Sequence, residues 1–346
     1  MSPPRRFLAR NAFRSAARVA AAVLIACITA WCAGVAFFTG PGGGDARVAG
    51  AFVPVIVGLG AIATLLVRRW RRFGVGSFAV VFGVLLAWWS TITPSNDRDW
   101  RPEVAVLPHA TIAGELVTVH GIRNFEYRSE DDFTPRYEDR TYDMRKLDSV
   151  DLVSAYWMGP AIAHLFVSFG FGDEHLDVSI EARKERTEGY TTLGGFFRQY
   201  ELVYVVGDER DLVRLRTNYR KDPPEDVYLM RLKGTIEQAR RFFLDYVESI
   251  NGLRDHPQFY NTLLTNCSTA ILVHARVNPG SLGYSWKVLA SGYAPEYVYD
   301  AGRTDRSLPY REFMRRSRIN DAARAADAAP DFSRRIRAGL PGMDAR

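Results

Sequence analysis

Three long apolar segments near the N-terminus constrain the fold of this chain more than any other feature. Residues 19–38 contain no charged side chain, and two further apolar runs occupy residues 51–67 and 74–93. About 20 apolar residues in a helix are enough to cross a hydrocarbon core of roughly 30 Å. The sequence therefore predicts a membrane region over residues 1–94 with three transmembrane helices. A cleaved signal peptide is the alternative for the first segment.

The arginines predict the orientation of these helices. They precede the first apolar segment and cluster again in residues 68–72, between the second and third segments. The positive-inside rule places both groups in the cytoplasm. Three crossings then put the rest of the chain outside the cytoplasm. We expect a multi-pass protein of the inner (cytoplasmic) membrane with its larger domain on the periplasmic side.

The charge distribution argues against a nucleic-acid partner. The chain has a net charge of +6, but residues 1–72 alone carry +9, so the remainder carries −3. The excess of arginine flanks apolar segments and forms no basic patch on a folded surface. We therefore expect no nucleic-acid partner and a protein embedded in the membrane.

For the rest of the chain, the sequence predicts a linker over residues 95–110 and a domain over residues 111–310. An Ala/Arg-rich C-terminal tail or frayed helix is expected over residues 311–346. Short runs of β-type residues bounded by turn residues predict a mostly antiparallel sheet. The expected strands are residues 116–128, with a possible bulge at Gly121, and residues 137–144, 150–157, 163–169, 175–183, 200–206, 212–217 and 227–232.

Two helices are expected after these strands, and the fold class is α+β. Thr235 and Gln238 form the pattern of a capping box, and apolar residues then keep helical spacing as far as Leu253. The second helix is short. It is expected to begin after Asn266 and to end at the Asn-Pro-Gly sequence of residues 278–280.

Cys267 is the one cysteine outside the first apolar segment, and it falls in the first turn of that short helix. Unpaired backbone N–H groups and the helix dipole are expected there to lower its pKa below about 8.5. A free thiol outside the cytoplasm has no cysteine partner, which favours use as a nucleophile. A buried apolar cysteine with only a structural role is the alternative.

His164 is the first candidate for the base, because it heads an otherwise apolar strand; His120 ranks second. His274 lies about two helical turns, or roughly 10 Å, beyond Cys267 and is too far away to act directly. On the strand that follows, Glu181 or Arg183 can face His164, and a carboxylate there would orient the imidazole. A satisfied core histidine and a surface charge cluster are the alternatives.

Four ordered motifs resemble the periplasmic domain of the Lnb family, whose namesake is a lipoprotein intramolecular transacylase. They lie in residues 163–171, 179–185, 200–211 and 259–269. The resemblance covers roughly residues 110–279 and implies that Cys267 is the nucleophile, His164 its base and Glu181 the third member.

The order of a His strand, a second strand and a Cys helix is also similar to the permuted NlpC/P60 and lecithin:retinol acyltransferase-like enzymes. That similarity implies a permuted papain-like fold for the extracytoplasmic domain. It is an analogy at the level of the fold.

The expected function is a cysteine acyltransferase that forms a thioester on Cys267, with membrane lipids or lipoproteins as substrates. Backbone N–H groups at the helix start would hold the oxyanion. Asn266, Tyr260, Asn261 and Arg183 are candidate oxyanion or positioning residues.

Two other functions remain open, and no cofactor is expected. One is a periplasmic cysteine peptidase or amidase that acts on cell-wall peptides, and the other is a non-catalytic, membrane-tethered binding protein. A metal site built from Cys267, His164 and His175 is not favoured, since no close ligand spacing supports it.

Overall fold

The structure is a computed structural model that describes residues 5–343. Residues 1–4 and 344–346, the ends of the expected membrane region and tail, lie outside the described residues. The chain forms two compact units. One contains residues 1–94 together with residues 191–199, and the other contains residues 95–190 and 200–346.

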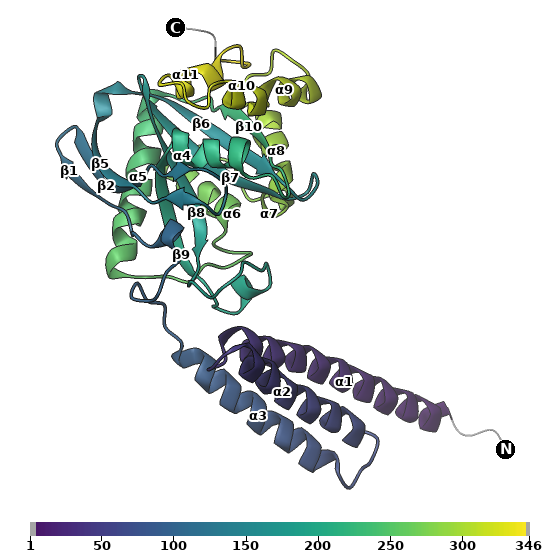
Figure 1. The fold of residues 1–346 in the computed structure, drawn as a ribbon. Helices are drawn as coiled ribbons and strands as arrows, with labels where there is room; N and C mark the ends of the chain where they lie inside the picture. Colours follow the sequence, from purple (N-terminus) through teal and green to yellow (C-terminus); the bar gives the residue numbers. More distant parts are fainter. Residues whose placement is uncertain (1–4, 344–346) are drawn as a thin grey trace. The chain divides into compact units, whose positions relative to one another are not determined.

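The first unit is built on three helices, α1 (Arg5–Thr39), α2 (Gly44–Thr64) and α3 (Arg71–Thr91), as Figure 1 shows. Each contains a segment long and apolar enough to span a membrane. This confirms the three expected membrane helices. A Cβ added at Gly58 would lie 2.0 Å from the hydroxyl oxygen of Thr29, so the glycine allows α1 and α2 to approach closely.

The segment 191–199 packs against these helices within the same unit. The ring of Phe197 stacks on Phe38 with 5.2 Å between centroids. The guanidinium of Arg198 lies 3.7 Å from the ring centroid of Trp89 and donates a hydrogen bond to the carbonyl oxygen of Trp89. A cation is favourable there, because the carbonyls at the end of α3 carry the negative end of the helix dipole.

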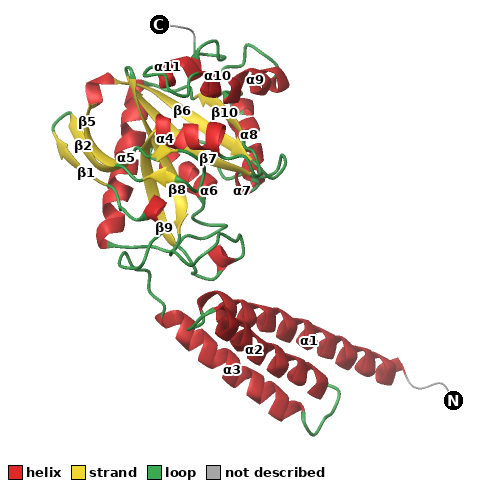
Figure 2. Ribbon diagram, viewed as in Figure 1, coloured by secondary structure: helices red, strands yellow, loops and turns green. Residues whose placement is uncertain are grey.

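The second unit contains an eight-stranded sheet with the order β1-β2-β9-β8-β7-β6-β10, and β5 pairs with β2 (Figure 2). Its strands are antiparallel except for one parallel bridge between β2 and β9. A small hairpin, β3 (Glu126–Tyr127) and β4 (Phe133–Thr134), lies apart from it. The strands of the sheet are β1 (His109–Ala113), β2 (Leu116–Arg123), β5 (Tyr137–Asp143), β6 (Leu147–Tyr156), β7 (Ala163–Phe171), β8 (Glu174–Arg183), β9 (Glu201–Asp208) and β10 (Asp226–Arg231).

The expected bulge is present in β2. The register between β2 and β5 shifts between Val119 and Ile122, and Gly121 has a φ of 76°. Glycine adopts this left-handed conformation without the steric cost that a Cβ would impose. The prediction of a bulge at Gly121 is confirmed.

One face of the sheet packs against α5 (Ile236–Asp255) and α6 (Cys267–Ala275). Thr235 caps α5 through the expected capping box with Gln238. The rings of Phe243 and Tyr246 on α5 meet Phe169 of β7 in edge-to-face contacts. Short helices α7 (Trp286–Leu289) and α8 (Ala294–Asp300) complete the cover beside α6.

The opposite face is covered by α4 (Glu209–Arg214), by a π-helical turn over Leu215–Tyr219 and by C-terminal helices. The prediction of a strand over residues 212–217 is wrong. Asp208 caps a helix there by accepting a hydrogen bond from the backbone N–H of Arg210. Leu212 and Val213 bury against the sheet from that helix, so their apolar character reflected a core position without a strand.

The prediction of a frayed tail over residues 311–346 is also wrong. The described part of this segment forms α9 (Tyr310–Ser317), α10 (Asn320–Ala325) and α11 (Phe332–Arg337). Phe332 and Ile336 are fully buried in the core of the domain. The buried guanidinium of Arg337 on α11 bonds Asp151 and Glu209, so the C-terminal segment is an integral part of the domain.

Candidate active site around Cys267 and His164

Cys267 is the first residue of α6, and so lies in the first turn of the helix, where the sequence predicted it. Asn266 is the N-cap, and its side-chain oxygen accepts a hydrogen bond of 2.8 Å from the backbone N–H of Thr269. The hydroxyl of Thr269 accepts a hydrogen bond of 3.0 Å from the backbone N–H of Asn266 in return. This reciprocal cap fixes where the helix begins and therefore where the sulfur lies.

The environment of the sulfur contradicts the expected low pKa. Burial raises the pKa of the Cys267 thiol, and the negative charge of Glu181 raises it further. The backbone N–H groups of Leu165 and Ser268 approach the sulfur and lower the pKa, as does Arg216, but burial is the larger effect. The cause is the loss of water around the sulfur, which destabilises a thiolate. Cys267 is therefore a neutral thiol near pH 7.

The contact with Leu165 places Cys267 beside β7. The pairing of β7 with β8 ends at Phe166 and Ser179, so Leu165 lies one residue beyond the last paired position. The start of α6 reaches the sheet there, and the sulfur lies at the backbone N–H of the residue that follows His164. The structure thus brings the two leading candidates from the sequence to the same end of β7.

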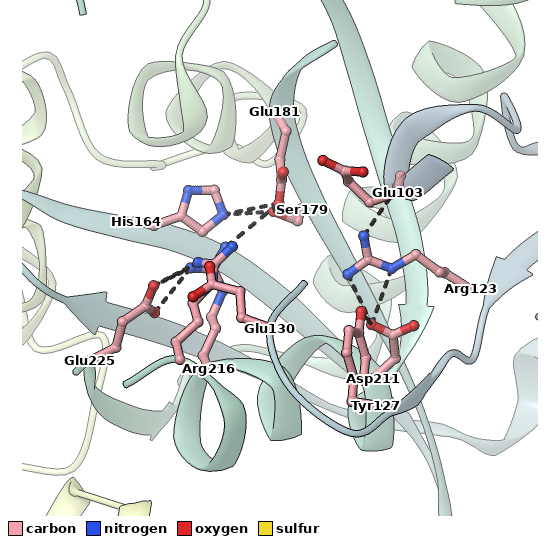
Figure 3. A network of polar contacts seen from close by, with 11 residues as sticks. Glu103, Arg123, Tyr127, Glu130, His164, Ser179, Glu181, Asp211, Arg216 and Glu225 are labelled. Carbon is pink, nitrogen blue, oxygen red and sulfur yellow. Dashed lines mark hydrogen bonds and ion pairs between the residues drawn. The ribbon is translucent and has the colours of Figure 1, made fainter. Parts of the chain in front are cut away.

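His164 is held by a chain of hydrogen bonds across β8. Its Nε2 lies 2.7 Å from the Ser179 hydroxyl, which donates to Glu181 Oε1 over 2.8 Å (Figure 3). Because the hydroxyl gives its proton to the carboxylate, it accepts from His164, and Nε2 must carry the proton. The other ring nitrogen, Nδ1, then has the free lone pair that a base requires.

The charges around this chain hold His164 neutral and Glu181 ionised. Burial and the nearby Arg216 lower the pKa of His164 to about 3. Burial opposes the charge of Glu181, but His164 and Arg216 outweigh it and lower the carboxyl pKa to about 2. At neutral pH the group facing the site is an uncharged imidazole that can accept a proton.

Arg216 and Ser179 are site residues that the sequence analysis missed. Arg216 lies in the π-helical turn after α4, 3.6 Å from Glu181, and bonds Glu225 at 3.0 Å. No sequence signal pointed to Arg216, because its segment was expected to be a strand. The sequence could have indicated Ser179, because it lies two residues before Glu181 and the alternation of side chains along a strand puts both on one face.

A second polar network lies next to the first. Asp211 of α4 lies beside Arg123 and Tyr127 (Figure 3) and accepts hydrogen bonds from the Arg123 guanidinium and the Tyr127 hydroxyl. It also accepts one from the backbone N–H of Phe125, and all of these bonds are between 2.7 and 3.1 Å long. Asp211 is fully buried and Arg123 nearly so. The two networks border a polar cavity of about 410 Å³. Charged residues that line it include Arg101, Arg123, Glu130, Glu181, Lys184 and Arg216.

Asn266 and Asn261, two of the candidate positioning residues, shape the turn before α6. Besides capping α6, Asn266 donates a hydrogen bond from its amide nitrogen to the carbonyl of Thr262. The side-chain oxygen of Asn261 accepts from the backbone N–H groups of Leu263 and Leu264, both at 3.0 Å. These contacts give both asparagines a structural task and provide no evidence for a contact with an oxyanion.

Arg183 and Tyr260, the other two candidates, differ from each other. Arg183 donates to the carbonyls of Val104 and Ala105 and lies over the ring of Trp100, so it fastens the segment before β1. Burial raises the pKa of the Tyr260 hydroxyl, and the charge of a Cys267 thiolate would raise it further. Its role in the site stays a prediction.

The other histidines have different surroundings. His274 is a core residue that bonds Asp245 at 2.6 Å and the Tyr204 hydroxyl at 2.7 Å. His120 lies in β2, which β9 and β8 separate from β7 in the sheet, and its Nδ1 lies 2.7 Å from the carboxylate of Asp139. Within residues 5–343, no group of three or more His, Cys, Asp or Glu side chains is arranged to hold a metal ion.

Residues 133–292 match the family model of the Lnb N-terminal periplasmic domain. This confirms the resemblance found in the sequence, and the matched range contains Cys267, His164, Ser179 and Glu181. No curated protein and no solved structure matches the chain. Together with the three candidate membrane spans, the family identifies a membrane protein with an extracytoplasmic domain.

Proposed function

We propose that this protein is a cysteine acyltransferase of the inner membrane. Its extracytoplasmic domain would take an acyl group from a lipid or lipoprotein ester onto Cys267 and pass it to an acceptor. The observation that carries the proposal is the arrangement around β7. The sulfur lies at the backbone N–H of Leu165, directly after His164, whose imidazole is oriented by Ser179 and Glu181.

The first half-reaction forms the thioester. Nδ1 of His164 takes the thiol proton while the sulfur of Cys267 attacks the ester carbonyl, so a C–S bond forms and the carbonyl oxygen becomes an oxyanion. Backbone N–H groups at the start of α6 are the donors available to hold that oxyanion. Collapse breaks the ester C–O bond, and the imidazolium gives its proton to the leaving alcohol. Glu181, acting through Ser179, stabilises the imidazolium in between.

The second half-reaction regenerates the enzyme. An acceptor amine attacks the thioester carbonyl and loses its proton to His164. The C–S bond breaks, and the imidazolium returns the proton to the sulfur of Cys267. The products are an amide and a free thiol. Water in place of the amine would give a free carboxylic acid by the same sequence of steps.

A cysteine peptidase or amidase is the second candidate function. It is favoured by the polar cavity beside Glu181, which is lined by several arginines and by Lys184 and would suit the carboxylates of a cell-wall peptide. The chemistry at Cys267 would be the same, with an amide bond in place of the ester. Release of peptide fragments from purified sacculi by the protein would support this second function and count against the first.

The test of the proposed function is the intact mass of the protein after incubation with native membranes. We expect a hydroxylamine-labile fatty acyl adduct that maps to Cys267 and is absent from the Cys267→Ala variant. Cys27→Ala, in the first membrane helix, is the matched control and should keep the adduct. Loss of the nucleophile should slow transfer by at least about 10³-fold. An adduct that persists in Cys267→Ala would refute the proposal.

A further inference from the structure

An apolar cavity of about 220 Å³ lies on the face of the sheet opposite the polar cavity. Leu152 and Leu165 form its floor on β6 and β7. Phe242 of α5 and Ile271 of α6 form its sides, and Val298 of α8 contributes to its cover. Protein interiors are packed as densely as organic crystals, so a space of this size with apolar walls is suited to an apolar ligand.

One end of this apolar cavity lies next to the candidate active site, where the chain neighbours of His164 and Cys267 line it. Leu165 and Ser268 both line the cavity, and they are the two residues whose backbone N–H groups approach the sulfur of Cys267. The hydroxyl of Ser268 donates to the carbonyl of Val288 over 2.6 Å, so this polar group is satisfied within the wall. An alkyl chain in the cavity would therefore meet no unpaired hydroxyl next to the reacting carbon.

The cavity follows α6 away from the sulfur. Ser268, Ile271, Leu272 and Ala275 line it at the spacing of one helix face, a distance of about 10 Å along the helix axis. The far end includes Lys233, which is exposed, so the cavity opens to the surface there. An elongated space with an open far end can hold chains of different length.

We propose that this cavity binds the fatty acyl chain of the substrate, with the carbonyl carbon at Cys267 and the methyl end directed along α6. The inference rests on the proposed acyl transfer and specifies its substrate class as long-chain acyl esters. The polar cavity on the opposite face, lined by Arg101, Lys184 and Arg216, is unsuited to an alkyl chain, because burying a chain there would desolvate charges.

The first arm of the test locates a bound chain without chemistry. Full-length Cys267→Ala in nanodiscs is irradiated with a palmitate analogue that carries a diazirine on its terminal carbon, and labelled peptides are mapped. We expect label in residues 232–242 and 271–282. Ile271→Phe should reduce that label by about tenfold or more, the cost of a misfit in an apolar pocket. Val273→Phe, on the exposed side of α6, should retain it.

The second arm measures acylation of Cys267 in the intact protein by nitrophenyl acetate, octanoate and palmitate. Ile271→Phe should slow acylation by palmitate and octanoate and leave acetate within about twofold of the parent. Equal slowing for all three esters, or for none, would overturn the acyl-chain site, as would photolabel confined to residues 12–91. Photolabel in the cavity without acylation by any ester would instead refute the proposed function and leave the binding site standing.

Discussion

The ionisation of Cys267 is the property on which the structure and the sequence analysis disagree most sharply. A helix start predicts a low thiol pKa, whereas burial and Glu181 raise it in the folded domain. The disagreement can be measured by alkylation, because iodoacetamide reacts with the thiolate and not with the thiol. Replacement of Cys27 and Cys32 by alanine leaves Cys267 as the single cysteine of the chain.

The expected magnitude follows from the fraction of thiolate. An ordinary cysteine of pKa near 8.5 is about 3 % ionised at pH 7. Burial raises the pKa of Cys267, so its thiolate fraction at pH 7 is smaller than that. A thiol activated by a helix start to a pKa near 6 would be about 90 % ionised at pH 7. The two readings of Cys267 therefore differ by at least about 30-fold in the concentration of the reactive thiolate.

The assay follows the rate of alkylation of the single-cysteine protein between pH 6 and pH 10, both folded in nanodiscs and unfolded in denaturant. We expect the folded rate to rise about tenfold per pH unit below its plateau and to level off at higher pH than the unfolded rate. Restricted access changes the absolute rate but not the pH at which it levels off. The shape of the profile is thus a measure of the pKa.

Two variants separate the contributions of charge from that of burial. Glu181→Gln removes a negative charge that raises the Cys267 pKa, so its profile should shift to lower pH. Arg216→Met removes a positive charge that lowers the same pKa, and its profile should shift to higher pH. A plateau below pH 7 in the folded parent protein would refute the reasoning, because it would show that the helix start dominates and that a thiolate is the resting state.

Two further predictions concern stability. The folded pKa of His164 is about 3, below the 6.5 of the unfolded chain. As the pH falls from 6.5 toward 3, the unfolded chain therefore binds a proton at His164 that the folded chain does not bind. The unfolding free energy falls in this window by up to about 1.4 kcal/mol per pH unit. His164→Gln should therefore show a shallower loss of unfolding free energy between pH 6.5 and 4 in denaturant titrations, and an unchanged slope would contradict the buried neutral imidazole. Asp211→Ala leaves the buried guanidinium of Arg123 without its carboxylate partner and should lower the unfolding free energy by about 3–5 kcal/mol. Glu312→Ala, at a surface ion pair with Arg315, should change the unfolding free energy far less in the same measurement.

The sequence predicted those features that local patterns determine. Uninterrupted apolar length gave the three membrane helices, period-two alternation gave most strands, and the capping box at Thr235 gave α5. The start of α6 near Cys267 could be predicted for the same reason, because Asn266 and the apolar run after it are close together in the chain. The strand prediction for residues 212–217 was wrong because a short apolar run is compatible with either a strand or a buried helix. The N-cap residue Asp208, which indicates a helix, was not included in that prediction.

The features that were missed depend on contacts between distant parts of the chain. The pairing of Phe166 with Ser179 sets the register that places the Ser179 hydroxyl between His164 and Glu181, and no local pattern fixes that register. Arg216 reaches the same place from a helical turn on another layer. The sign of the pKa shift at Cys267 also depends on what the tertiary fold packs over the sulfur, so a rule based on the helix start alone could not give it.

For the proposed acyltransferase, a neutral thiol and a neutral imidazole at the same end of β7 have a chemical consequence. Oxidation and disulfide exchange proceed through the thiolate, so a raised pKa protects the single extracytoplasmic thiol of the chain, Cys267, in an oxidising compartment. The same low pKa of His164 makes proton transfer from the thiol unfavourable while no carbonyl is present to be attacked. In the proposed reaction, transfer would become productive when the sulfur forms a bond to carbon, because the negative charge would then move to an oxyanion facing backbone N–H groups, and Glu181 would stabilise the imidazolium. Reactivity in this arrangement is therefore coupled to the presence of substrate.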